Sequence, residues 1–405
     1  DLRMSRGLGD VYKRQMQHAI KAAKTGFFPS VDFSGSYQYR INKYDLDFGP
    51  GMSVEMDHNT YSLGATVSQP IYAGGQIYNN YKAAQVQGKI TEQAEELTTD
   101  NIVYSADLNY WTAAARKGMY DVMCQYVDIV GELANVLTIR FNDGQISKTD
   151  LLQVESRLKE AELNKSSAYK EYQIALQNLN SLMGVSPLDP IEVEDSITTY
   201  LALPLQVGED VALRNRPDYA ISELNIEYQK RQINLSKAKY NPSLAIGFQG
   251  TWGTPMLNVK GSDQLWTPAV FASLKIPLFR WGARFKEVNS QKAILRSKEY
   301  ALDNTRDKIA QEVANAWTSL TEYTKQITVA EEACKIAEEN LDLNTFSYNE
   351  GKLPILDVLS AQLSWIQSYS SLIQTWYQQK ASLAQYNKAI GIRRLPVSYT
   401  HLTLP

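Results

Sequence analysis

Few side chains in this sequence are of the kinds that usually carry out chemistry. Among its 405 residues there are three histidines and two cysteines, spread from His18 to His401. A structural zinc site needs about four such ligands at short spacings, and a disulfide framework needs several cysteine pairs. The chain also lacks a nucleophile elbow, a phosphate-binding loop and an isolated pair of acids. We expect no catalytic residue, no cofactor-binding residue and no metal site, so an enzyme is the last of three alternatives.

Two aspartates nevertheless stand in equivalent surroundings. Asp150 and Asp357 each follow a short turn that ends in glycine, and each is followed by two apolar residues. The simplest interpretation is that both are N-capping or first-turn acids, since a carboxylate stabilises the unpaired N–H groups at the start of a helix. Whether Asp150 and Asp357 have a further role depends on the helices and strands that position them.

The two aspartates belong to an internal repeat with an offset of 207 residues, as 150 and 357 show. Segments more than 100 residues apart keep this offset, and such agreement by chance is improbable. The segments that match at 207 are Gln69-Pro70-Ile71 with Ile276-Pro277-Leu278, Phe141-Asn142-Asp143-Gly144 with Tyr348-Asn349-Glu350-Gly351, and Met183-Gly184 with Ile390-Gly391. Between them, Trp111-Thr112 matches Trp317-Thr318 at an offset of 206.

Each repeat contains two segments in which apolar and small or polar residues alternate. They predict strands at about 30–41, 60–69, 243–252 and 266–276. Strands of about ten residues rich in aromatic side chains are typical of membrane barrels, although alternation alone fits a soluble sheet equally well. In a membrane the apolar face would meet lipid, and the residues on that face would be Phe33, Tyr37, Tyr39, Tyr61, Leu63, Val67, Ile246, Phe248, Trp252, Val270 and Leu274.

Long helices follow the predicted strand pairs. The stretches 76–140 and 283–348 lack proline, and each would span about 95 Å at 1.5 Å per residue. Apolar residues step by three and four along the second stretch, from Ile309 to Leu341 through Cys334, which predicts helices packed side by side. Glycines at 144 and 351 favour a tight reversal into shorter helices at about 148–183 and 355–390.

These elements predict two repeats joined by a connector. The first repeat covers 16–184 and begins at the end of a helix, the connector covers 185–212, and the second repeat covers 213–391, with a helix at about 217–239. The ends, 1–15 and 392–405, match nothing else in the chain. We interpret them as a non-native leader and tail, with no helical pattern near Gly7 and Gly9.

The composition of the chain argues against one class of partner and one class of membrane protein. The formal net charge is −3 and the basic residues form no cluster, so nucleic acid is not an expected partner. No run of about 18 consecutive apolar residues occurs, which argues against a bundle of transmembrane helices.

Taken in order, the repeat and its motifs resemble the TolC-like outer-membrane efflux protein family over essentially residues 16–391. The resemblance is carried by the two helix-reversal motifs and by three further segments: Gly26-Phe27-Phe28-Pro29-Ser30-Val31, Gln69-Pro70-Ile71-Tyr72-Ala73-Gly74-Gly75 and Arg214-Asn215-Arg216-Pro217-Asp218. It implies an α+β membrane protein that forms a homotrimer, in which four strands from each chain close a 12-stranded β-barrel in outer-membrane lipid. The helices would continue as a periplasmic α-helical barrel.

The resemblance also implies a function. Such a protein is the passive outer-membrane channel of a tripartite efflux or type I secretion system in a Gram-negative-type bacterium, and works with a periplasmic adaptor protein and an inner-membrane transporter. The periplasmic entrance maps onto Asp357, Tyr348 and Asp150. The adaptor-contacting turns map onto Asn142, Asp143, Gly144, Asn349, Glu350 and Gly351. Two positions depart from the family pattern, since Leu353 replaces a gate arginine and Ser360 replaces a second acid.

Elementary physics supports the oligomer independently, because four antiparallel strands cannot close a barrel and an open edge cannot persist in lipid. The alternative to a channel is a soluble periplasmic coiled-coil adaptor or scaffold with a small β-domain.

Overall fold

The computed structural model describes residues 2–42, 45–47, 49–50, 53–255, 259–260 and 262–392, with side chains from residue 11 onward. The chain divides into two compact units, each assembled from both halves of the sequence. The sheet unit comprises 11–92 and 221–302, and the helical unit comprises 1–10, 93–220 and 303 onward.

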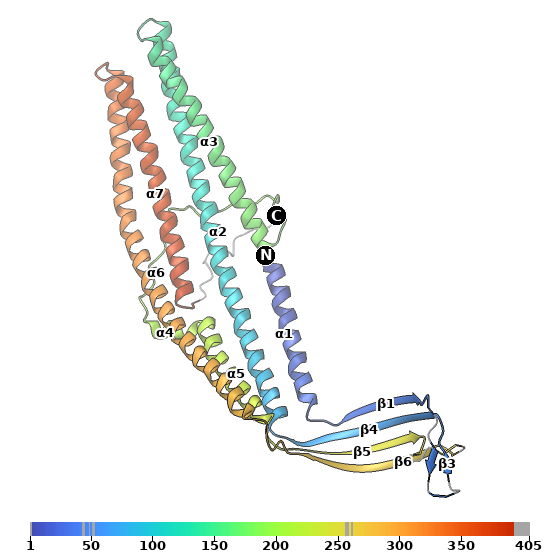
Figure 1. The fold of residues 1–405 in the computed structure, drawn as a ribbon. Helices are drawn as coiled ribbons and strands as arrows, with labels where there is room; N and C mark the ends of the chain where they lie inside the picture. Colours follow the sequence, from blue (N-terminus) through green and yellow to red (C-terminus); the bar gives the residue numbers. More distant parts are fainter. Residues whose placement is uncertain are drawn as a thin grey trace. The chain divides into compact units, whose positions relative to one another are not determined.

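A four-stranded antiparallel sheet forms the centre of the sheet unit (Figure 1). Its strands are β1 (Ser30–Tyr39), β4 (Asn59–Ala73), β5 (Ser243–Gly253) and β6 (Leu265–Lys275), in the order β1-β4-β5-β6. The central pair, β4 and β5, joins one strand from each repeat, so the two repeats share one sheet. β1 and β6 are its free edges.

The register of the sheet sorts the side chains onto two different faces. Phe33 lies opposite Ala65, Val67 opposite Phe248, and Phe248 opposite Val270, so apolar residues line up across all four strands. The other face carries Ser34, Thr66 and Gln249 with other polar or small residues. Neighbouring residues on a strand point to opposite faces, and this alternation therefore produces one apolar and one polar face.

A turn of special geometry connects each strand pair to its long helix. Gly74 has a φ of +64°, and a Cβ atom there would lie 2.7 Å from the carbonyl oxygen of Ala238, so only glycine fits. At the equivalent place in the second repeat, Trp281 adopts a φ of 49°, which is uncommon for a bulky residue. Gly282 follows with a φ of 73°. The repeat thus keeps the turn and replaces one glycine with tryptophan.

Helices of the sheet unit pack in pairs beside this turn. α1 (Leu2–Thr25) lies against the start of α2 (Gln76–Asn142), where a Cβ on Gly88 would lie 2.9 Å from the Ile20 side chain. α5 (Pro217–Ala238) lies against the start of α6 (Ala283–Asn349), and the Gln229 side-chain amide donates to the Gln291 side chain at 2.8 Å.

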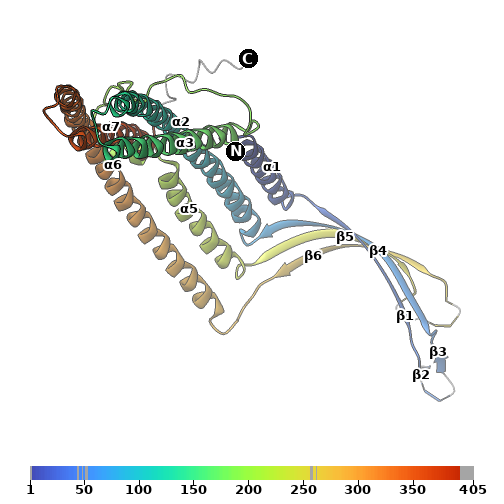
Figure 2. The ribbon, with the colours of Figure 1, turned by 90° about the horizontal axis from the view of Figure 1, so that it is seen from above.

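The helical unit is a row of four helices, α3 (Lys148–Met183), α2, α7 (Ile355–Ala389) and α6, in that order (Figures 1 and 2). Ring contacts fix the neighbours: Tyr120 of α2 with Tyr169 of α3, Tyr126 of α2 with Trp365 of α7, and Trp317 of α6 with Tyr386 of α7. The predicted seam along α6 is buried at Ile309, Val313, Ala316, Leu320, Ile327, Cys334, Ala337 and Leu341.

The connector crosses the helical unit and is fastened by side chains of α2 and α7. Tyr110 donates to the Asp195 carboxylate at 2.5 Å, and Lys117 donates to the carbonyl oxygen of Val193 at 2.9 Å. Lys380 donates to the carbonyl oxygen of Thr199. Burial and the adjacent Asp195 carboxylate raise the pKa of Tyr110 far above its usual value, so its hydroxyl remains a donor.

Arg216 fixes the start of the second repeat. Its guanidinium binds the Asp218 carboxylate through two nitrogens, at 3.0 and 2.6 Å, and the Glu312 carboxylate at 2.5 Å. α5 begins at Pro217, directly after this arginine, so the motif that opens the second repeat also ties α5 to α6.

Several elements differ from the expectations. The helix α1 begins at Leu2, because the good helix formers between Lys13 and Ala23 outweigh the cost of about 1 kcal/mol for each glycine near its start. A short hairpin of β2 (Asp45–Asp47) and β3 (Ser53–Glu55) and the helix α4 (Glu209–Asn215) were not predicted. Most of the expected tail lies outside the described residues.

α2 contains an 18-residue window with a mean hydropathy of 1.3, which would suit a membrane span by composition, and 33% of that window is buried inside the protein.

Candidate functional site

The two helix reversals have the same backbone geometry. Gly144 has a φ of 73° and donates to the carbonyl oxygen of Phe141 at 2.9 Å, while Gln145 donates to Arg140 at 2.8 Å. In the second repeat Gly351 has a φ of 69°, and the two equivalent bonds to Tyr348 and Ser347 both measure 2.9 Å. Such left-handed caps satisfy the last carbonyls of a helix. All six predicted turn residues from 142–144 and 349–351 are exposed, as an interaction surface requires.

The two aspartates beside these reversals are held differently. Ser147 caps α3: its hydroxyl accepts from the Asp150 backbone at 3.1 Å and donates to the Asp150 carboxylate at 2.9 Å. The cap of α7 is Pro354, which offers no side-chain hydrogen bond, and the exposed Asp357 donates its own N–H to the Pro354 carbonyl at 3.2 Å. Asp150 therefore serves its helix terminus, whereas the Asp357 carboxylate faces solvent.

Tyr348 is buried and has a cationic neighbour that the sequence did not suggest. The Arg140 guanidinium lies 5.4 Å from the centroid of the Tyr348 ring, and its Nη2 atom donates to the Asn349 side chain at 3.1 Å. Arg140 stands in the last turn of α2, and Tyr348 in the last turn of α6. This contact links the ends of the two long helices within one chain. The repeat partner of Arg140 is Ser347, so the repeat gave no signal of the contact.

The two departures from the family pattern lie close to Asp357. Leu353 is half-buried in the turn before α7, and Ser360 is exposed one turn beyond Asp357. Neither can supply charge. At this end Arg140 supplies a cation beside Tyr348, the exposed Lys352 lies directly before Leu353, and Asp357 is the solvent-facing acid of α7.

All of the predicted lipid-facing residues lie on the same apolar face of the sheet. The register aligns Tyr37 with Tyr61, Leu63 with Trp252, and Leu244 with Leu274. Most are exposed, with Val270 at 84% and Phe33 at 75%. Trp266, which pairs with Trp252 on this face, was missed because it stands at the start of its strand.

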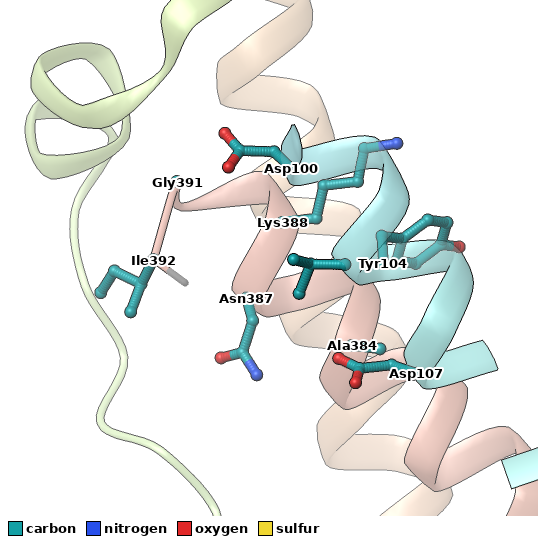
Figure 3. Close-up of a pocket in the computed structure, with 9 residues that line it drawn as sticks. Asp100, Tyr104, Asp107, Ala384, Asn387, Lys388, Gly391 and Ile392 are labelled. Atoms are coloured by element: carbon teal, nitrogen blue, oxygen red, sulfur yellow. The ribbon is translucent and has the colours of Figure 1, made fainter. Parts of the chain in front are cut away.

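A shallow recess lies between α2 and α7 (Figure 3). Asp100, Tyr104 and Asp107 line it from α2, and Asn387 and Lys388 from α7. The Lys388 ammonium lies 4.5 Å from the Tyr104 ring centroid, and burial raises the pKa of the Tyr104 hydroxyl. Within the described ranges, no cluster of three or more His, Cys, Asp or Glu side chains could hold a metal ion.

Comparison with known proteins agrees with this geometry. The family model described as "Outer membrane efflux protein" matches residues 10–185 and 210–392. The chain belongs to this outer-membrane efflux protein family. That membership decides against the alternative of a soluble adaptor or scaffold. It makes the chain a non-enzymatic transport protein, an outer-membrane efflux channel with a periplasmic helical extension.

The individual relatives with similar sequences are distant. Nodulation protein T of Rhizobium leguminosarum bv. trifolii is 24% identical over 264 residues, which are 64% of this chain and 56% of that protein. The outer membrane efflux protein BepC of Brucella suis biovar 1 is 20% identical over 358 residues, covering 88% and 75% of the two chains.

Solved structures of outer-membrane channels share the fold. The outer membrane protein VceC of Vibrio cholerae superimposes with a TM-score of 0.80 at 16% identity, covering 96% of this chain and 92% of that one. The match confirms the predicted TolC-like fold of strand pairs and long antiparallel helices in two repeats. Channels of this family form trimers.

Proposed function

We propose that three copies of this chain close a single 12-stranded barrel and form a passive duct for a tripartite efflux or type I secretion system. The duct would connect the periplasm to the exterior, with a periplasmic adaptor and an inner-membrane transporter as partners.

The observation that carries this proposal is the open sheet with one apolar face. Every residue of β1 is exposed, and the edge strands β1 and β6 each leave a row of N–H and C=O groups without a strand partner in the described sheet. Such an edge cannot persist in a bilayer, where no water satisfies the backbone. Because all neighbouring strands are antiparallel, β6 of one copy can pair antiparallel with β1 of the next.

Exposed aromatic residues at one end of the sheet support its insertion in a membrane. Around the junctions between the strands and their helices, the exposed aromatic residues are Phe28, Tyr72, Phe279, Trp281 and Phe285, with Trp281 at 86%. Aromatic side chains of this kind gather at the boundary between lipid and water in membrane barrels. The polar face, with Ser34, Thr66 and Gln249, would line the water-filled lumen.

We place the periplasmic entrance at the helix reversals. Three copies of Asp357 would form an acidic ring there, because each carboxylate faces solvent at the end of the helical unit. The exposed turn residues would meet the adaptor. Tyr348 and Arg140 would hold the two reversals of each copy together.

Reconstitution in planar bilayers tests the proposal. The full chain, refolded or extracted in detergent, should insert as a trimer and give uniform, ohmic conductance steps. A monodisperse protein that extracts into buffer without detergent and gives no conductance would contradict it. Heat-denatured protein added at the same concentration is the matched control.

A further inference from the structure

The junction between β6 and α6 carries charges that the equivalent junction of the first repeat lacks. In residues 276–286 the charged side chains are those of Arg280, Arg284 and Lys286, and all three are exposed. Residues 69–79, which match this segment at the repeat offset of 207, contain no charged side chain. Both halves keep the turn, so its backbone geometry does not require the three cations.

The three cations keep their charge uncompensated in the sheet unit. The Arg280 guanidinium lies 5.6 Å from the Tyr240 ring centroid, a contact that holds the group without cancelling its charge. The neighbouring acid in the sequence, Glu287, pairs with Lys239 at 3.4 Å. Among the residues that the structure describes, no acidic side chain forms an ion pair with any of the three cations.

Two of the cations stand where a helix disfavours positive charge. α6 begins at Ala283 and has no acidic residue in its first turn, which contains Arg284 and Lys286. The N-terminus of a helix carries a partial positive charge, so cations placed there are destabilising. An anion that approaches this junction would interact favourably with both side chains and with the helix end.

Exposed aromatic rings are interleaved with the cations, and one of them stands on a strained backbone. Trp281 adopts a φ of 49° at the position that Gly74 occupies in the first repeat. Its side chain is 86% exposed and contacts the Phe279 ring, with 5.1 Å between the centroids. A bulky residue in this conformation is strained, and here the strain is not offset by burial within the chain. The strain therefore points to a partner outside the chain.

The apolar face of the sheet leads directly into this junction. Leu274 is the last residue of β6 on that face, and Ile276 and Leu278 continue beyond it, both exposed. Exposed aromatic rings suit the boundary between lipid and water better than a water-filled lumen. At that boundary the phosphate groups of anionic lipids attract Lys and Arg side chains.

We propose that the junction 276–286 binds the headgroup of an anionic phospholipid in the leaflet at the helix end of the sheet. Arg280, Arg284 and Lys286 bind the phosphate, while Trp281 and Phe285 lie beside the glycerol backbone and the start of the acyl chains. Each chain has one such site, because the junction of the first repeat is neutral. This inference rests on the proposed insertion of the sheet in a membrane and adds the chemical class of lipid that it binds.

Lipid binding to the detergent-solubilised full chain tests the charges. The probe is fluorescently labelled phosphatidylglycerol, and labelled phosphatidylcholine is the uncharged comparison. The wild type should bind phosphatidylglycerol more tightly. Arg280→Gln with Arg284→Gln should weaken this binding about 25-fold, since each cation contributes about fivefold, and should leave phosphatidylcholine binding unchanged.

The matched control removes the same charge from the same helix. Arg296→Gln with Lys298→Gln changes two exposed positions that begin about 18 Å farther along α6 than Arg284. This variant should keep the wild-type affinity for phosphatidylglycerol. An equal loss in both double variants would show that only the overall charge matters, and would overturn the site.

Trp281→Gly restores the residue of the first repeat and tests the aromatic contact. It should weaken the binding of both lipids, because the ring lies beside the part that they share. It should not lower the melting temperature in detergent without lipid, because glycine relieves the strain. A variant that loses stability and keeps its lipid binding would show that Trp281 serves only the turn.

Two further outcomes separate this site from the proposed duct. Wild-type trimers that conduct in bilayers but bind the two lipids equally would overturn the headgroup site and leave the duct intact. Glycerol phosphate that competes as well as the whole lipid would overturn the assignment to a lipid. A wild-type protein that does not insert into bilayers would overturn the duct, and the headgroup site with it.

Discussion

The sheet and the helical row differ in where their apolar side chains lie, exposed on the sheet and buried in a seam of the helical row. The helical row buries a continuous seam, including Leu137, Leu320 and Trp365, and so has a core of its own. The sheet directs its apolar residues outward, and Val270 is 84% exposed. The comparison teaches that the sheet depends on lipid and on neighbouring copies, whereas the helical row has a core within one chain.

Charge placed on the apolar face of the sheet should have the largest effect. Val270→Lys puts an ammonium where we expect lipid and should cost about 2–4 kcal/mol near the middle of the bilayer. Ala269→Lys, on the neighbouring residue of the polar face, should be tolerated. The amount of heat-modifiable trimer in purified outer membranes measures both. Equal tolerance of the two lysines would show that the face is not in lipid.

The helical row, in contrast to the sheet, already buries a charged side chain, that of Lys380. It is 1% exposed, and its ammonium lies 4.9 Å from the Trp111 ring centroid and 5.1 Å from that of Trp376. Burial lowers the pKa of Lys380 from 10.5 to about 8. The unfolded chain therefore binds more protons between these values, so the stability of the folded state rises with pH from about 8 to 10.5.

Lys380→Met should remove this rise. The melting temperature of the wild type should increase relative to the variant by about 2–4 °C between neutral pH and the upper part of that range. Lys388→Met, at an exposed position on the same helix, should leave the wild-type pH slope unchanged. A Lys380→Met protein with the full wild-type slope would contradict the assignment.

The contact between Arg140 and Tyr348 should have a smaller effect. Arg140→Ala removes a cation–π contact worth about 1 kcal/mol and should leave trimer formation intact. We expect the entrance to spend more time open, which single-channel recordings would register as a higher open probability. Arg157→Ala, which removes an ion pair within α3, serves as the control. Identical recordings for the two variants would mean that Arg140 only packs the helix ends.

We expect the smallest effects from replacing Asp357 or Asp150, and these effects should differ between the two aspartates. Asp357→Ala should weaken block of the channel by a trivalent cation about tenfold, because three exposed carboxylates are lost from one ring. Asp150→Ala should change the block little and instead lower stability by about 1 kcal/mol, since it removes the partner of Ser147. Unchanged block by both variants would reduce Asp357 to a helix-terminus acid.

The sequence sufficed for elements that are long and periodic. The strand at 243–252 could be predicted because apolar and polar residues alternate along it, and the helix at 148–183 because its apolar residues keep heptad spacing over many turns. β2 and β3 contain three residues each, too few for any period to appear. β4 extends past the predicted end through Pro70, which lacks an N–H, because β1 pairs only as far as Ser68 and leaves that side free.

Contacts between distant residues were beyond the reach of sequence patterns. Asp150 could be placed at a helix terminus from its local sequence alone. The contact of Arg140 with Tyr348 depends on how two long helices end beside each other, and the burial of Lys380 depends on the connector that crosses it. Neither arrangement leaves a periodic trace in the sequence.

The central claim is that the sheet is one third of a barrel. Single-particle imaging of the detergent-solubilised full chain tests it most directly. We predict three copies around one axis, with twelve strands in a single barrel and β6 of each copy beside β1 of the next. Particles that contain one copy, or copies whose sheets remain open and separate, would contradict the account.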